Sequence, residues 1–116
     1  MNIEEFREYC LTLKGVTEEF PFGGDVLVYK VMGKMFALTI LNTDFTINLK
    51  CDPELAIELR EEFSAVTPGY HMNKKHWNTI ICNEVSSKQL KEWIDHSYFL
   101  VLNSLPKKVK DEYNSL

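Results

Sequence analysis

Residues 26–50 read VLVYKVMGKMFALTILNTDFTINLK and contain three short apolar runs separated by two turn signals. The turn signals are Met32-Gly33-Lys34 and Asn42-Thr43-Asp44, residue types that connect antiparallel strands. The predicted strands are Val26–Val31, Met35–Leu41 and Phe45–Lys50. Three successive strands joined by tight turns exclude a doubly wound parallel sheet and indicate a two-layer α+β domain.

The third of these runs alternates regularly between apolar and polar side chains. Phe45, Ile47 and Leu49 fall on one face, and the residues between them are polar. This pattern is typical of an antiparallel sheet that packs on helices with one face only. We therefore expect the other face of the sheet to be polar.

Helix signals lie on both sides of this strand region. Asn2 and Glu5 have capping-box spacing before a helix over 3–14, and Asp52-Pro53 is an N-cap with proline at the first helical position, which begins a helix over 53–63. Ser86 with Gln89 begins a long helix that ends near Ser104. The remaining predicted elements are an irregular strand at Val66–Met72, a strand at Trp77–Cys82 and a short basic helix after Pro106.

Length and composition place the chain among ordinary globular proteins. It has 116 residues, of which 45% are hydrophobic and 26% charged, so we expect one domain over residues 1–116. No apolar run approaches the ~20 residues of a membrane span, and the acidic N-terminus is unlike a signal peptide. Three widely spaced cysteines favour a reducing compartment. We therefore expect a cytoplasmic protein without a membrane partner.

The net charge of −4 argues against a strongly basic nucleic-acid-binding protein, but the charges are unevenly distributed. Residues 26–51 carry three lysines and one aspartate, and residues 66–83 carry two lysines and no acid. Two of the predicted helices are acidic. The folded chain is therefore expected to have one positive face.

Motifs for catalysis or metal binding are absent from the sequence. It contains no phosphate-binding loop, no nucleophile elbow and no H-E-x-x-H. His71 and His76 with Cys82 form a weak metal-site candidate, because two lysines and no carboxylate lie in that segment. Cys51 stands beside Lys50 before a helix, but no base or oxyanion motif accompanies it. We expect no enzymatic activity, no metal and no cofactor.

Basic and aromatic side chains form the one constellation suited to binding a partner. On an uncovered sheet face, lysines contact phosphate oxygens, and aromatic rings stack on a base or support the loop. The alternative is a solvated face whose lysines discourage edge aggregation. The candidate nucleic-acid-binding residues are Lys30, Lys34, Lys50, His71, Lys74, Lys75, His76 and Trp77.

Five segments of the chain resemble the MmcQ/YjbR-like family, in order and over nearly its whole length. They are EFPFG at 19–23, VYKVMGKMFA at 28–37, LKCDP at 49–53, PGYHMNKKHWN at 68–78 and SYFLV at 97–101. The resemblance implies an α-β3-α-β2-α domain with a five-stranded antiparallel sheet, similar to secretion chaperones. It also implies DNA binding through a double-wing arrangement, and it supplies no catalytic residues.

Three functions stay open at this point. The first is weak, non-specific DNA binding, because arginine occurs only at Arg7 and Arg60, both expected to pair locally among glutamates. The second is a protein- or peptide-binding module with an exposed apolar face, for example at Tyr29 and Trp77. The third is a small-molecule site near His71, Cys51 and Lys50. We also expect residues 70–78 to be anchored by burial of Tyr70 and Trp77, while the oligomeric state stays open.

Overall fold

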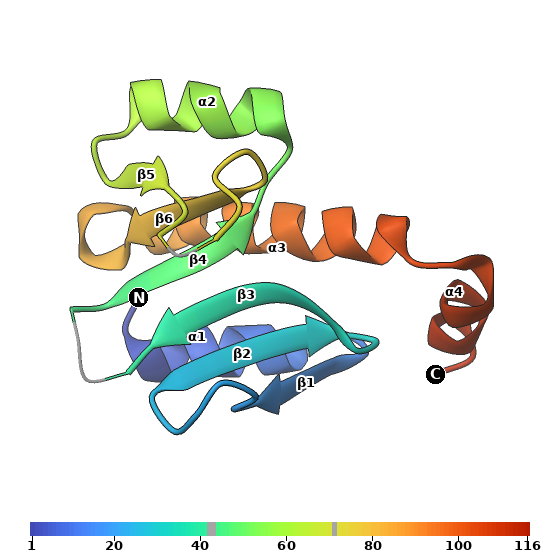
Figure 1. Ribbon diagram of the computed structural model, residues 1–116. Coiled ribbons are helices and arrows are strands. Elements are labelled where there is room, and N and C mark those ends of the chain that lie inside the picture. Colours follow the sequence, from blue (N-terminus) through green and yellow to red (C-terminus); the bar gives the residue numbers. More distant parts are fainter. Residues whose placement is uncertain (42–43, 71) are drawn as a thin grey trace.

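The computed structural model describes residues 1–41, 44–70 and 72–116 and has the α+β architecture expected from the sequence (Figure 1). A 3₁₀ turn at Cys82–Glu84 precedes the helix that begins at Ser87. The elements are α1 Ile3–Thr12, β1 Val16–Glu19, β2 Val26–Val31, β3 Lys34–Ile40, β4 Thr46–Lys50, α2 Pro53–Glu62, β5 Val66–Pro68, β6 Trp77–Ile81, α3 Ser87–Ser104 and α4 Lys107–Asn114.

The strands form one antiparallel sheet in the order β1-β2-β3-β4-β6-β5. Within the described residues the sheet has six strands, so the expected count of five is wrong. The strand that the sequence did not reveal is β1, which reads VTEE. Its Glu18 lies beneath α1, where Arg7 donates two hydrogen bonds to the carboxylate. An acidic side chain on the covered face conceals the alternation that marks a strand.

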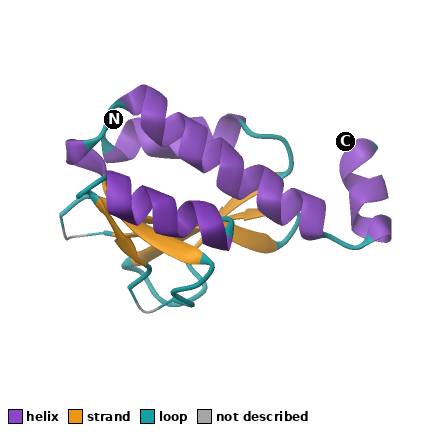
Figure 2. Ribbon diagram, turned by 90° about the horizontal axis from the view of Figure 1, so that it is seen from above, coloured by secondary structure: helices purple, strands orange, loops and turns teal. Residues whose placement is uncertain are grey.

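Helices α1, α2 and α3 cover one face of the sheet and leave the other open (Figure 2). Phe6 of α1 packs edge-on against Tyr29 of β2 at 5.4 Å between ring centroids. Tyr98 of α3 packs similarly on Phe36 at 5.5 Å. All four rings are buried, so the core lies between the helices and this face.

The capping residues predicted from the sequence form N-cap hydrogen bonds at the starts of the helices. Asn2 and Glu5 form a reciprocal capping box, and the Asp52 carboxylate accepts a hydrogen bond from the Leu55 N–H at 3.2 Å. Ser86 accepts from the Gln89 N–H, but the Gln89 side chain bonds Glu92 instead of closing a box. The strand expected over Val66–Met72 is much shorter and ends at Pro68.

Strands β3 and β4 separate near the end of β4, and a serine from α3 joins them there. The two strands pair from Ala37–Leu49 to Thr39–Ile47, and a register shift follows on the β2 side of β3. Beyond Ala37 the Ser97 hydroxyl accepts from the Lys50 N–H at 2.9 Å and donates to the Phe36 carbonyl at 2.5 Å. This buried hydroxyl takes the place of a direct hydrogen bond between the strands where the β3–β4 pairing ends.

Candidate functional site

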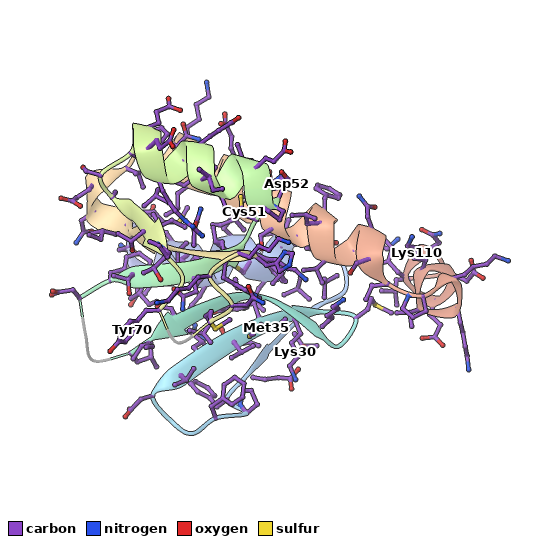
Figure 3. All side chains as sticks on the ribbon, turned by 45° about the horizontal axis from the view of Figure 1, so that its top comes forward. Lys30, Met35, Cys51, Asp52, Tyr70 and Lys110 are labelled. Carbon is purple, nitrogen blue, oxygen red and sulfur yellow. The ribbon has the colours of Figure 1, made fainter. Side chains whose placement is uncertain are left out.

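The topology gathers lysines from separate parts of the chain at one end of the sheet. Because neighbouring strands are antiparallel, the ends of β2 and β4 lie beside the starts of β3 and β6. Lys30 is opposite Met35, as Figure 3 shows, and Lys50 is opposite Trp77. We call this group the lysine end, and its members are Lys30, Lys34, Lys50, Lys74 and Lys75.

Most of the lysine end lacks acidic partners. Lys30 forms an ion pair with Glu19 at 3.2 Å, and the Lys34 ammonium donates to the Ser104 hydroxyl at 3.0 Å. Within the described parts of the chain, no carboxylate lies within ion-pair distance of Lys34, Lys50, Lys74 or Lys75. Burial and the positive charge of Lys34 both lower the pKa of Lys50. Uncompensated positive charge of this kind attracts anions.

Arg60 of α2 anchors the segment that carries Lys74 and Lys75. Its guanidinium donates to the Asn78 side-chain oxygen at 2.7 Å and to the backbone carbonyls of Trp77 and Lys74. The expectation that Arg60 pairs with a glutamate is therefore wrong. Sequence analysis missed this role because nothing local links Arg60 to carbonyls of Lys74 and Trp77. Arg7 does pair with an acid, Glu18, which belongs to β1.

Tyr70 and Trp77, the two aromatic residues of the 70–78 segment, differ in their exposure to solvent. Trp77 is only 8% exposed, as expected, whereas Tyr70 is 66% exposed, which contradicts its expected burial. Trp77 therefore supports the segment and does not present a ring for stacking. His76 is half-buried, and its carbonyl accepts from the Cys51 N–H at 2.8 Å. His71 lies outside the described residues.

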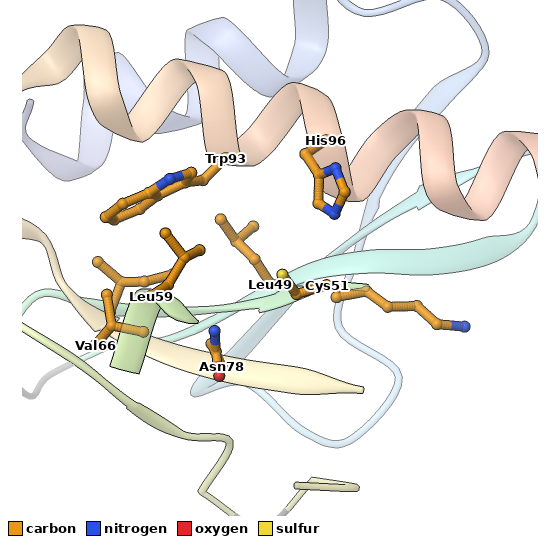
Figure 4. A pocket seen from close by; sticks show the side chains of 9 residues that line it. Leu49, Cys51, Leu59, Val66, Asn78, Trp93 and His96 are labelled. Carbon is orange, nitrogen blue, oxygen red and sulfur yellow. The ribbon is translucent and has the colours of Figure 1, made fainter. Parts of the chain in front are cut away.

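The hollow beside Cys51 and His96 has a volume of about 10 Å³, and Figure 4 shows its apolar lining, which includes Trp93 and Leu59. That volume holds one water molecule at most. Burial raises the pKa of Cys51 to about 11 and that of Cys82 to about 12, so neither thiol is activated. All three cysteines are free and buried.

No metal-binding cluster is present among residues 1–41, 44–70 and 72–116: no three His, Cys, Asp or Glu side chains are placed to hold an ion. In the same ranges, no helix is both long and apolar enough to cross a membrane.

The open face of the sheet is apolar at its centre, which contradicts the polar face expected from the alternation of Phe45–Lys50. That alternation holds for β4, but β2 and β3 carry apolar residues on both faces. The result is an open-face groove of about 300 Å³. It is lined by Phe22, Val26, Met35, Leu38, Ile40, Asn48, Tyr70 and Met72. The exposed aromatic side chains here are Phe22 and Tyr70, not Tyr29 and Trp77, which are buried.

Comparison with known proteins identifies a family that the chain matches. The family model described as YjbR matches residues 11–100. The chain belongs to the YjbR family. The resemblance expected from its sequence motifs is thereby confirmed.

Relatives and solved structures agree with this assignment. The chain is 36% identical to protein YbdF of Escherichia coli O157:H7 over 108 residues, which cover 90% of this chain and 88% of that protein. It is 32% identical to YjbR of E. coli K12, over 91% and 92% of the two chains. Both are described as uncharacterized, so membership assigns no activity.

Two solved structures share the fold of this YjbR-family protein. A crystal structure of a Deinococcus radiodurans protein is 36% identical and superposes with a TM-score of 0.91, covering 97% of this chain and 88% of the other. A Pseudomonas syringae protein is 29% identical, with a TM-score of 0.75 over 86% and 98% of the two chains.

Proposed function

We propose that this YjbR-family protein binds DNA weakly and without sequence preference, in a non-enzymatic role, through phosphate contacts at the lysine end. The observation that carries the proposal is the gathering of Lys34, Lys50, Lys74 and Lys75 at one end of the sheet. These lysines lack carboxylate partners among the described residues. Lysine is a point-charge partner for phosphate and carries little base specificity.

Among the described residues, the acidic side chains of α1 and α2 form no ion pair with the lysine end. The glutamates of α1 and α2 belong to the helical layer (Figure 2), and Glu54 of α2 lines a surface hollow together with Lys74 and Lys75. A negative overall charge is therefore compatible with a locally positive end.

Both arginines already have partners within the chain: Arg7 forms an ion pair with Glu18, and Arg60 donates hydrogen bonds to backbone carbonyls of the 74–77 segment. Neither is free for bidentate contact with guanine, which favours binding without base readout.

Counterion release gives the proposal a measurable signature. Four phosphate contacts predict a slope of log K against log salt of about −3.6, at ~0.9 per neutralised phosphate. Fluorescence anisotropy with a labelled duplex of about two helical turns, ~20 base pairs, measures this slope from about 50 mM salt upward. Absence of wild-type binding at ~50 mM salt would refute the proposal.

A matched pair of double variants distinguishes a specific contribution of the lysine end to binding from the effect of the overall net charge. K74E/K75E changes the lysine end, and K88E/K91E changes the first turns of α3 instead. Both take the formal net charge from −4 to −8. We expect K74E/K75E to weaken binding at least ~10-fold and K88E/K91E to weaken it much less. Equal losses in the two variants would show that the lysine end is not the site.

A further inference from the structure

The open-face groove is a second feature of the molecule, and DNA binding at the lysine end does not use it. Phe22 and Tyr70 are each 66% exposed. An adjoining hollow of about 230 Å³ shares Leu38 and Tyr70 with the groove and extends to Thr46 and Thr79. Together they make a connected surface across β3 and β4 that is apolar at Phe22, Ile40 and Tyr70 and polar at Thr46 and Thr79. Contiguous surfaces of this kind mark interaction sites on monomeric proteins.

The shape of the groove suits an extended chain. Its floor follows β3 from Met35 to Ile40, a length of about 17 Å at ~3.3 Å per residue. That length matches about five residues of an extended peptide. Side chains of such a peptide that point to the floor meet Met35, Leu38 and Ile40, and Phe22 and Tyr70 flank them at the rim.

The charge at one end of the groove indicates the chemistry of the occupant. The end at Met35 adjoins the lysine end, since Lys30 is the cross-strand partner of Met35. Lys50 follows the groove residue Asn48 by two positions on the same strand, and strand alternation places both on the same face. Lys30 is already paired with Glu19, whereas Lys50 has no carboxylate within ion-pair distance in the described ranges. An acidic residue of a bound peptide complements Lys50 at this end.

Other occupants fit this surface less well. A nucleobase stacks best on an aromatic plane, whereas the floor of the groove is aliphatic and thioether, with rings only at the rim. An acyl chain needs a site that encloses most of its surface. The exposure of Phe22 and Tyr70 shows that this groove stays open above its rim.

We propose that the open-face groove binds an extended apolar peptide segment of a partner protein, with an acidic residue of that segment at Lys50. The proposal does not depend on DNA binding. It concerns the centre of the open face and not the lysine end of the sheet, and the two sites share only Lys50.

The test begins with selection from a phage-displayed library of random heptapeptides on the immobilised full chain, followed by anisotropy with the most enriched peptide after labelling. We expect enriched sequences with alternating apolar residues and an Asp or Glu near one end. We expect F22A/Y70A to weaken binding at least tenfold. The matched control is I57A/F99A, which removes two side chains of comparable exposure from α2 and α3 and should leave binding unchanged.

A double-mutant cycle then tests the charge. K50Q and a Glu-to-Gln change in the peptide should each weaken binding, and together they should weaken it no more than either alone. K74E/K75E should leave peptide binding unchanged, and F22A/Y70A should leave DNA binding unchanged, so each proposal can fail by itself. Three results would overturn this one: no enrichment, binding that is insensitive to F22A/Y70A, or a wild-type dimer in sedimentation that F22A/Y70A dissociates. The last result would identify a second copy as the occupant.

Discussion

Replacing Ser97 with alanine tests the junction that positions Lys50. The hydroxyl is fully buried and satisfies two backbone groups, the Lys50 N–H and the Phe36 carbonyl, where β3 and β4 separate. Alanine leaves both groups without a partner, and each buried unsatisfied group costs about 1–3 kcal/mol. The higher helix propensity of alanine returns about 0.5 kcal/mol. We therefore expect Ser97→Ala to lower the free energy of unfolding by about 3 kcal/mol.

Urea unfolding followed by circular dichroism measures this loss, with the slope of the transition compared between variants. The control is Ser104→Ala at the exposed end of the same helix, where the hydroxyl donates to the Val101 carbonyl at 2.7 Å and accepts from the Lys34 ammonium at 3.0 Å. The control should change stability by at most about 0.5 kcal/mol. If Ser97→Ala costs no more than this control, the hydroxyl does not join β3 to β4 where their pairing ends.

Three further outcomes test other parts of the molecule. Trp77→Ala should lower stability by about 3 kcal/mol, because the side chain is 8% exposed, and an unchanged denaturation midpoint would show it to be dispensable. Cys51 should react with iodoacetamide at neutral pH about 100-fold more slowly than an unhindered thiol, because burial raises its pKa from 9.0 to about 11. Fast alkylation of Cys51, detected by mass spectrometry, would contradict this. The hydrogen bond from Arg7 lowers the pKa of Glu18 in the folded protein. The ionised carboxylate therefore stabilises the fold at pH values above its unfolded pKa of about 4.3. This stabilisation is lost as the pH falls through the lower pKa of the folded state. Glu18→Gln should therefore be less stable than the wild type at neutral pH and approach it at about pH 3, whereas a difference that stays constant with pH would exclude ionisation as the cause.

Several elements of the fold were predictable because their signals are local. Strand Val26–Val31 has the bounds expected from its sequence, and the caps at Asn2 and Asp52 form as their spacing indicates. The irregular strand expected over Val66–Met72 stops at Pro68, and Gly69 follows with its N–H bonded to the Trp77 carbonyl. Strand β1 escaped prediction because Glu18 faces Arg7 of α1, a partner eleven residues away.

Some features of the candidate site were likewise predictable from the sequence, and others were not. The lysines were identified as residue types, and the antiparallel order of the predicted strands is what brings Lys30, Lys34 and Lys50 to one end. Arg60 was assigned the wrong partner, since its guanidinium reaches backbone carbonyls of the segment before β6. An exposed apolar face was one of the open expectations, but it was assigned to Tyr29 and Trp77 and not to Phe22 and Tyr70. The groove itself was missed because the clean alternation of a single strand was extended to the whole sheet.

The sequence by itself determined the α+β class, the helix starts and the family, because turn residues, caps and hydrophobic periodicity act over a few neighbouring positions. Tertiary structure alone decided that Ser97 joins β3 to β4, that Arg60 holds the Lys74 segment, and that Leu38 and Ile40 floor an uncovered groove. Each of these depends on contacts between residues distant in the chain. Whether an apolar strand residue is covered is set by which helices pack on the sheet, and here they pack on one face only.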